Sequence, residues 1–186
     1  MPDTLSLDGN NTKIYRHSGF TTTICNSFSS PSTAPQDIGG NLSAFWSVDY
    51  TAGRLYRHSG FSSTLCNSFS SPSTKPVGVT TNSSTGDLFS ADEGTTDKIY
   101  RHSKFTTTIC NSFSSPSISV RGLTHDGSNI YSVDIDSRKF YYHSAFTTTI
   151  RNSFSSPSNN AADIRRGGTN FYSVDATSLK IYYLSG

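Results

Sequence analysis

Short runs of alternating apolar and polar residues, separated by turn-forming residues, cover the whole chain. In the run KIYRHS at 98–103, Ile99 and Arg101 fall on one side while Tyr100 and His102 fall on the other. This is the two-residue period of a β-strand. The surrounding runs extend the prediction to strands at 76–81, 87–92, 98–103 and 106–113, with Gly-, Ser-, Thr- and Asp-rich turns between them. We therefore expect an all-β fold without helices.

One phrase of about 20 residues recurs along the chain, four times nearly in full and once in part. Its copies begin at Lys13, Arg54, Lys98, Lys139 and Lys180. The tyrosines at its third position are 41, 44, 41 and 41 residues apart. A period in the low forties is typical of propeller blades and of helix-pair repeats, and the abundance of Thr, Ile, Tyr and Phe favours strands. The sequence therefore predicts a β-propeller of about 41-residue, four-stranded blades.

The repeat divides the chain into five units of one domain, 1–186. The units are 1–32, 33–73, 74–117, 118–158 and 159–186. We label the strands of a blade A to D, from the central channel outwards. The first unit starts at a strand B, because Asp8 matches the Asp that ends strand B elsewhere, and the last unit stops after a strand C. Five blades, with incomplete first and last blades, are favoured; a closed ring of four blades is the alternative.

The order of short motifs within a unit resembles that of a known group of propellers. P-x-G-[VL], [LI]-[FY]-S-x-D and [KR]-[ILF]-Y follow one another with turns between them. This order is similar to the NHL and surface-layer-type propeller repeats. The resemblance implies a propeller fold and a role in binding, and it transfers no catalytic residue to this chain.

Composition and charge narrow the possible partners. The chain has 15 Lys and Arg against 13 Asp and Glu, a net charge of +2, which gives no basic surface for nucleic acid. No apolar run approaches the roughly 20 residues of a membrane helix. The first residues, MPDTLSLDGNNTK, have neither the basic start nor the apolar centre of a signal peptide. We therefore expect neither a nucleic-acid partner nor a membrane span.

Aromatic and polar residues recur at matched positions of the predicted strands C and form a candidate ligand-binding set between blades. The set is Tyr15, Arg16, His17, Tyr56, Arg57, His58, Tyr100, Arg101, His102, Tyr141 and His143. Aromatic faces beside cationic donors suit sugar rings, and repeated sites would add avidity. The alternative is that these side chains pack adjacent blades together. The histidines of different blades are too far apart to share a metal ion, so no metal is expected.

The cysteines also repeat once per blade. Cys25, Cys66 and Cys110 fall at the same position of strand D, where the fourth copy has Arg151. Blade spacing exceeds the roughly 7 Å reach of a disulfide, so we expect free, partly buried thiols. Free thiols favour a reducing compartment or a virion assembled in one, and leave the localisation otherwise open.

No sequence motif of catalysis is present: there is no G-x-S-x-G, no phosphate-binding loop and no paired acid constellation. No cofactor is expected. The copies differ most in their strands A, which line the channel. If one unique site exists, we expect it there, and the candidate rim residues are Asp37, Arg121, Asp163, Arg165 and Arg166.

The favoured function is a non-enzymatic binding or assembly module for a glycan or a protein. A purely structural surface or virion component, which associates through its incomplete end blades, is the alternative, because unpaired strand edges promote association. A hydrolase or lyase at the channel mouth is a weaker alternative.

Overall fold

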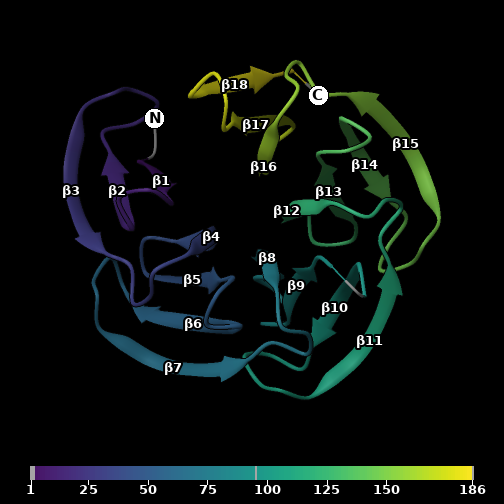
Figure 1. Ribbon diagram of the computed structural model, residues 1–186, viewed down its shortest axis with the longest axis horizontal. Coiled ribbons are helices and arrows are strands. Elements are labelled where there is room, and N and C mark those ends of the chain that lie inside the picture. The colour runs from purple at the N-terminus through teal and green to yellow at the C-terminus, as the bar shows by residue number, and fades with distance from the viewer. Residues whose placement is uncertain (1–2, 95, 186) are drawn as a thin grey trace.

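The computed structural model describes residues 3–94 and 96–185, and in them the chain forms five antiparallel sheets around a central axis (Figure 1). The sheets are β1 (Thr4–Asp8), β2 (Lys13–His17) and β3 (Ile24–Ser29); β4 (Pro35–Asn41), β5 (Ala44–Asp49), β6 (Arg54–Ser59) and β7 (Leu65–Ser70); β8 (Pro76–Thr81), β9 (Leu88–Asp92), β10 (Lys98–His102) and β11 (Ile109–Ser114); β12 (Val120–His125), β13 (Ile130–Asp134), β14 (Lys139–His143) and β15 (Ile150–Ser155); and β16 (Ala161–Gly167), β17 (Asn170–Asp175) and β18 (Lys180–Leu184). The described residues contain no helix. The five-bladed propeller is confirmed, and the four-bladed alternative is not adopted.

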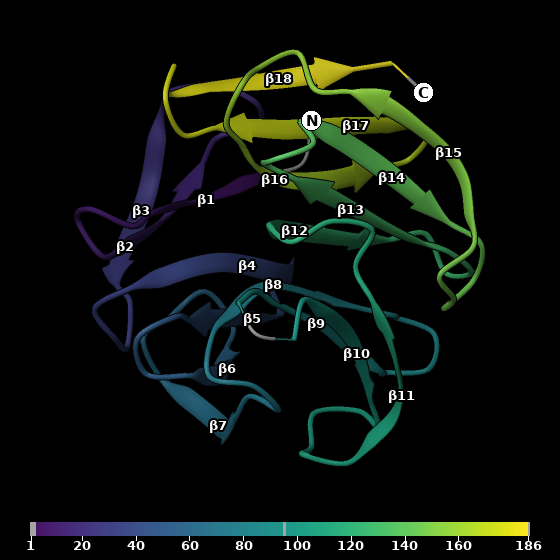
Figure 2. The same cartoon turned by 45° about the vertical axis from the view of Figure 1, so that its right-hand side comes forward.

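Each sheet is one blade, and its strands follow one another from the channel outwards. The A strands β4, β8, β12 and β16 contact one another in that order around the channel, and the D strands β3, β7, β11 and β15 lie on the outside (Figure 1). The first blade contains strands B, C and D, and the fifth contains A, B and C, as the repeat spacing predicts. These two blades are neighbours in the ring (Figures 1 and 2).

The apolar core lies between neighbouring blades. In one cluster, Ile99 and Phe113 of the third blade pack with Val120, Leu123 and Ile130 of the fourth. All five are at most 8% exposed, and burial of each such side chain contributes roughly 1.5–3 kcal/mol. The alternation of apolar residues in strands B and C therefore serves contacts between blades as well as contacts within a sheet.

The connection between strands C and D is longer than the sequence suggests. Strand D was expected from Thr106, but β11 begins at Ile109. The Thr106 hydroxyl donates to the Ser103 carbonyl (2.8 Å) and accepts from the Thr108 N–H (3.2 Å). These bonds hold the three threonines in a turn. Lys104 starts this turn with a left-handed φ of 56°, where two other copies have Gly.

In the second, fourth and fifth blades, the Asp at the end of strand B joins the following turn to the start of strand A. In the second blade, Asp49 accepts from the Ala52 N–H (2.6 Å) in the following turn and from the Ala34 N–H (2.7 Å) at the entry of strand A. Asp134 makes the equivalent bonds in the fourth blade. One carboxylate thus fixes both a turn and the start of the strand that lines the channel.

Candidate binding site at the channel mouth

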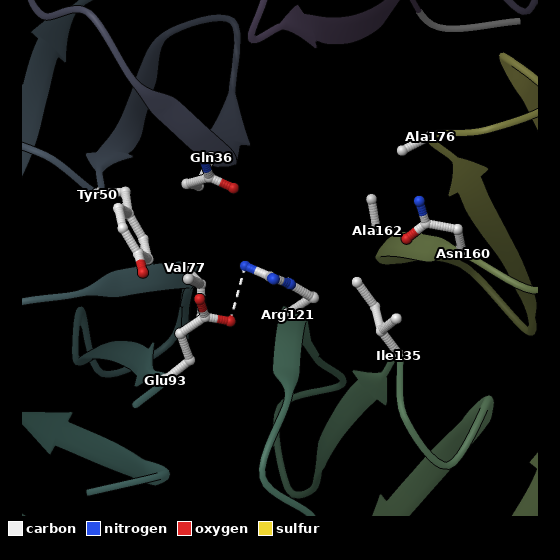
Figure 3. Close-up of a pocket in the computed structure, with 9 residues that line it drawn as sticks. All are labelled: Gln36, Tyr50, Val77, Glu93, Arg121, Ile135, Asn160, Ala162 and Ala176. Carbon is white, nitrogen blue, oxygen red and sulfur yellow. Dashed lines mark ion pairs between the residues drawn. The ribbon is translucent and has the colours of Figure 1, made fainter. Parts of the chain in front are cut away.

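A pocket of about 390 Å³ opens where the A strands enter the channel, and we call it the mouth pocket (Figure 3). Its lining comes from two positions of the repeat. The second residue of each strand A gives Gln36, Val77, Arg121 and Ala162. The residue that follows the Asp at the end of strand B gives Tyr50, Glu93, Ile135 and Ala176, and Asn160 completes the wall. Both positions differ in every blade, so the pocket is asymmetric in a molecule that is otherwise nearly symmetric.

A β-bulge places the second residue of each strand A. Pro76 pairs with Asp92 and Gly78 with Ala91, so Val77 is the extra residue between two paired neighbours. The same shift of register occurs in the second, fourth and fifth blades. Bulges redirect side chains and are frequent beside functional sites. Here they lie beside the mouth pocket in all four blades that have a strand A.

One ion pair dominates the polar side of the mouth pocket. The Arg121 guanidinium lies 2.8 Å from a Glu93 carboxylate oxygen, and both side chains are largely shielded from solvent. Arg121 Nε is buried and has no hydrogen-bond partner among the described residues. Figure 3 shows Arg121 reaching towards Glu93 and Gln36, with Asn160 and the two alanines on the opposite side.

A lysine outside the lining lies over the aromatic side chain of the same pocket. The Lys75 ammonium lies 5.2 Å from the centre of the Tyr50 ring. A hydrogen bond with Tyr50 is the main reason why the pKa of Lys75 is raised above its usual value. The mouth pocket therefore combines fixed charges, amide groups, a phenol and small apolar side chains.

Deeper in the channel, the structure brings together two carboxyl groups that are far apart in the sequence. Asp37 on β4 accepts from the Ile38 and Val79 N–H groups, both at 2.6 Å. Asp163 on β16 accepts from the Ile164 N–H at 2.6 Å and is hydrogen-bonded with Asp37. The expectation that no paired acids exist was therefore wrong, because the pair forms only when the ring brings β4 and β16 together.

Burial controls the ionisation of this pair. It raises the pKa of Asp163 to about 7, against hydrogen bonding and the positive charge of Arg165. Burial also raises the pKa of Asp37 well above its usual value, and the neighbouring Asp163 raises it further. Two adjacent carboxyl groups in a poorly solvated site hold a proton between them near neutral pH.

Space for Asp163 comes from a glycine in the adjacent strand A, β12. A Cβ atom at Gly122 would collide with the Asp163 carboxylate and its backbone. Gly78 holds the corresponding position of β8, where a Cβ would collide with the Arg121 carbonyl oxygen. At the third position of β8 and of β12, glycine therefore leaves room for the strand A of the following blade.

The remaining predicted rim residues lie elsewhere. Arg165 and Arg166 border a second cavity, of about 690 Å³, between the fifth blade and the first, which we call the seam cavity. Arg165 donates to the Gly40 carbonyl across the channel. Arg166 pairs with Asp126 (3.3 Å) and lies over the Tyr131 ring. Of the five rim candidates, only Arg121 lines the mouth pocket.

The predicted inter-blade set is divided between interior and surface. His58, His102 and His143 are at most 1% exposed, and each shares a hydrogen bond of 2.9 Å with a serine of strand B. Each ring also contacts a phenylalanine of the preceding strand D, as His102 does with Phe69 at 5.3 Å. Burial lowers the pKa of both His102 and His143 to about 4. These histidines are accordingly neutral and packed inside the protein.

Other members of the set are more accessible. His17 is half-buried and bonds to Ser6 at 2.7 Å. Arg16 and Arg101 pair with Asp3 and Asp87. The remaining members are the buried Tyr56 and Tyr100, the half-buried Tyr15 and Tyr141, and the exposed Arg57. The structure does not gather this set around any cavity described above, and its role in binding stays a prediction.

The cysteines are free, as expected, but exposed rather than partly buried. Cys110 is the extra residue of a bulge, because Arg101 pairs with Asn111 while His102 pairs with Ile109. The bulge on the outermost strand leaves the thiol in solvent, which also accommodates Arg151 in the fourth copy.

No family model and no curated protein matches this chain. Among solved structures, it is similar to a glutaminyl cyclase of Myxococcus xanthus, with a TM-score of 0.75 at 11% identity over 98% of this chain and 86% of that one. It is also similar to the computationally designed Ika8 protein, with a TM-score of 0.59 at 9% identity over 100% of this chain and 56% of that one. A chain of a mitotic checkpoint complex gives a TM-score of 0.59 at 9% identity over 95% of this chain and 69% of that one. At these identities, the similarities show the propeller fold alone. Within the described residues, no helix has the length and apolar character to cross a membrane.

Proposed function

We propose that this chain is a non-enzymatic binding propeller whose ligand is a small glycan held in the mouth pocket. The observation that carries the proposal is the convergence of four bulged positions, different in each blade, on a single pocket. Its volume of about 390 Å³ falls in the range of small-molecule sites, roughly 300–1,000 Å³.

The chemistry of the lining supports a polyhydroxylated ligand. A sugar hydroxyl both donates and accepts, and the pocket supplies donors from Arg121, acceptors from Glu93 and both from Asn160. Tyr50 and Ile135 add apolar surface for the faces of a ring. The relationship to NHL and surface-layer-type repeats, with their binding roles, is part of the same proposal.

The test is a panel of neutral and acidic mono- and disaccharides, titrated calorimetrically against the chain and its variants. We expect one ligand per chain and an affinity at least about tenfold weaker for Arg121→Gln, because a charged hydrogen bond contributes roughly 1.5–3 kcal/mol. Glu93→Gln should shift preference towards acidic sugars, because it leaves Arg121 without its counter-charge.

Arg57→Gln is the matched control, since Arg57 is exposed and belongs to the inter-blade set. Binding of several ligands per chain that is weakened by Arg57→Gln and unaffected by Arg121→Gln would transfer the site to the strands C. No binding by any sugar of the panel would reject the glycan proposal.

A second candidate function is acid–base chemistry at the seam cavity. Asp163 lines this cavity beside Arg165, and burial raises its pKa to about 7, where a carboxyl group can exchange a proton near neutral pH. A hydrolase or lyase activity abolished by Asp163→Asn and untouched by Arg121→Gln would replace the binding proposal.

A further inference from the structure

The seam cavity lies between the two blades that have three strands each. It is bordered by the start of β1, by the end of β4 with its turn, by β16 and by Val174 and Ile181 of the fifth blade. Among the described residues, β1 pairs only with β2 and β18 pairs only with β17. The inner edge of the first blade and the outer edge of the fifth are thus both unpaired, and the two blades are neighbours (Figures 1 and 2).

Exposure at repeat-equivalent positions shows what is missing from this seam. The first apolar residue of each strand C is 0% exposed in Ile14, Leu55 and Ile99, and 1% exposed in Phe140. Its equivalent in the fifth blade, Ile181, is 38% exposed. The same type of residue in the same type of strand is therefore buried in four blades and solvent-accessible in the fifth.

The buried equivalents identify the residues that would cover Ile181. Ile99 packs with Phe113 of its own strand D and with Val120 and Leu123 of the next blade's strand A. These three covering residues belong to one continuous stretch, 109–125, which runs from the outside of the third blade to the inside of the fourth. The corresponding stretch would run from the outer edge of β18 to the inner edge of β1.

The same three positions recur at constant spacing in every D–A stretch of the chain. They are Phe28, Pro35 and Ile38; Phe69, Pro76 and Val79; Phe113, Val120 and Leu123; and Phe154, Ala161 and Ile164. All four phenylalanines belong to strands D, and the residues that follow begin and line the next strand A.

An aromatic position at the seam points to the same segment. The strand D phenylalanine of one blade contacts the corner phenylalanine of the next: Phe28 with Phe61 at 5.0 Å, and Phe113 with Phe146 at 4.9 Å. The corner residue of the first blade, Phe20, lines the seam cavity and contacts Tyr172 at 5.3 Å instead. A phenylalanine from a strand D beside β18 would meet Phe20 as its equivalents meet theirs.

We propose that the seam cavity and the two free strand edges form a docking site for one extended segment of a separate polypeptide, of the D–A type of this repeat. The segment adds a strand to β18, inserts its phenylalanine beside Phe20 and adds a second strand to β1. Backbone pairing gives affinity and the three apolar positions give specificity, as in other strand-addition complexes. A second copy of this chain is a poorer donor, because each of its own D–A stretches is already engaged in its own ring, with its strand D paired to a strand C and its strand A paired to a strand B.

The test uses the whole chain and a fluorescent synthetic peptide of residues 147–167, which carries Phe154, Ala161 and Ile164 and has Arg151 instead of a cysteine. We expect saturable binding of one peptide per chain by fluorescence anisotropy. Hydrogen exchange should slow at β1 and β18 and stay unchanged at β7. A peptide with Phe154→Ala should bind at least about tenfold more weakly, because it loses an aromatic pair and its buried area. The matched Arg151→Ala peptide should bind as the parent does, since Arg151 is exposed.

Two variants of the chain complete the test. Phe20→Ala should weaken binding, whereas Phe61→Ala, at a seam that already contains its phenylalanine, should lower the melting temperature and leave affinity unchanged. Absence of binding at millimolar peptide, or equal binding of the parent, Phe154→Ala and scrambled peptides, would overturn the proposal. A concentration-dependent dimer of the chain that the peptide fails to dissociate would overturn it as well, in favour of a second copy.

Discussion

The seam between the third and fourth blades and the seam between the fifth and first blades come from the same repeat but are filled differently. At the first, Phe113 contacts the His143 ring at 5.2 Å and the Phe146 ring at 4.9 Å. At the second, the contacts across the blades include the rings of Phe20 and Tyr172, beside a cavity of about 690 Å³. We call the first a filled seam and the second the open seam.

The difference shows that burial in this molecule is set by the neighbouring blade. KIYRH at 98–102 and KIYYL at 180–184 differ at two positions, yet Ile99 is fully buried and Ile181 is 38% exposed. A local pattern of alternation predicts the strand equally well in both cases. Whether its apolar face becomes core depends on a strand D and a strand A that come from elsewhere in the chain.

The comparison is tested most strongly by removing one phenylalanine from each seam, the strand D residue Phe113 from the filled seam and the corner residue Phe20 from the open seam. Phe113→Ala should lower the free energy of unfolding by about 3–5 kcal/mol, because Phe113 is 8% exposed and packs in the core cluster of two blades. Phe20→Ala should cost clearly less, since Phe20 is only half-buried and borders a cavity. Urea denaturation followed by circular dichroism measures both.

Phe69→Ala serves as the control, because Phe69 fills another seam in the same way. It should behave as Phe113→Ala does. Equal losses for Phe20→Ala and Phe113→Ala would show that the open seam is as tightly packed as the filled ones.

The carboxyl pair provides the next largest effect. Burial raises the pKa of Asp163 to about 7, so the folded chain retains a proton that the unfolded chain releases above its usual pKa of 3.8. The resulting stabilisation is complete below about pH 4 and is lost as the pH rises through about 7. Asp163→Asn, which has no proton to lose, should be more stable than the parent by about 1–3 kcal/mol at about pH 8.

The pH dependence distinguishes this effect from a change in packing. The advantage of Asp163→Asn should shrink towards zero as the pH falls below about 4. A difference that stays constant from acid to alkaline pH would mean that the carboxyl group is not protonated in the folded chain.

Most of the fold follows from the sequence, because the same pattern of strands and turns recurs in each unit of the repeat. The number of strands, the incomplete first and last blades and the five-bladed ring were all predicted from the spacing of Asp and Tyr. The start of strand D was wrong because Thr106 and Thr108 have high strand propensity, while a hydroxyl bond to the Ser103 carbonyl holds them in a turn.

Less of the candidate site could be predicted. Divergence among the strands A identified Arg121 and both aspartates, but pattern alone does not reveal that Asp37 and Asp163 meet. Glu93 and Tyr50 were missed, although the residue after each strand B Asp differs in every blade and gave a usable signal. The direction in which the side chains of Gln36 and Arg121 point depends on β-bulges, which cannot be recognised in the sequence.

The buried histidines of the filled seams should control the acid limb of stability. Burial lowers the pKa of His102 to about 4, so the folded chain keeps it neutral while the unfolded chain takes up a proton below about pH 6.5. Stability is therefore intact above about pH 6.5 and is lost as the pH falls towards 4. Between about pH 7 and pH 4.5, the parent should lose roughly 1–2 kcal/mol more than His102→Gln. Parallel pH profiles for the two proteins would contradict the neutral, buried histidine.

The smallest effect is expected at an exposed position of a strand D whose phenylalanine fills a seam. On β7, Phe69 is 7% exposed and contacts Phe105 of the next blade, whereas Cys66 is exposed. Cys66→Arg reproduces the residue that the fourth blade carries at the equivalent bulge, Arg151, and should change the free energy of unfolding by less than about 0.5 kcal/mol. In the folded parent, Cys25, Cys66 and Cys110 should all react with a thiol reagent at rates near that of a free peptide, because none is buried or bridged. A thiol that reacts only after unfolding would show that the outer strand is covered, and that the contrast in burial between Phe69 and Cys66 is smaller than the structure indicates.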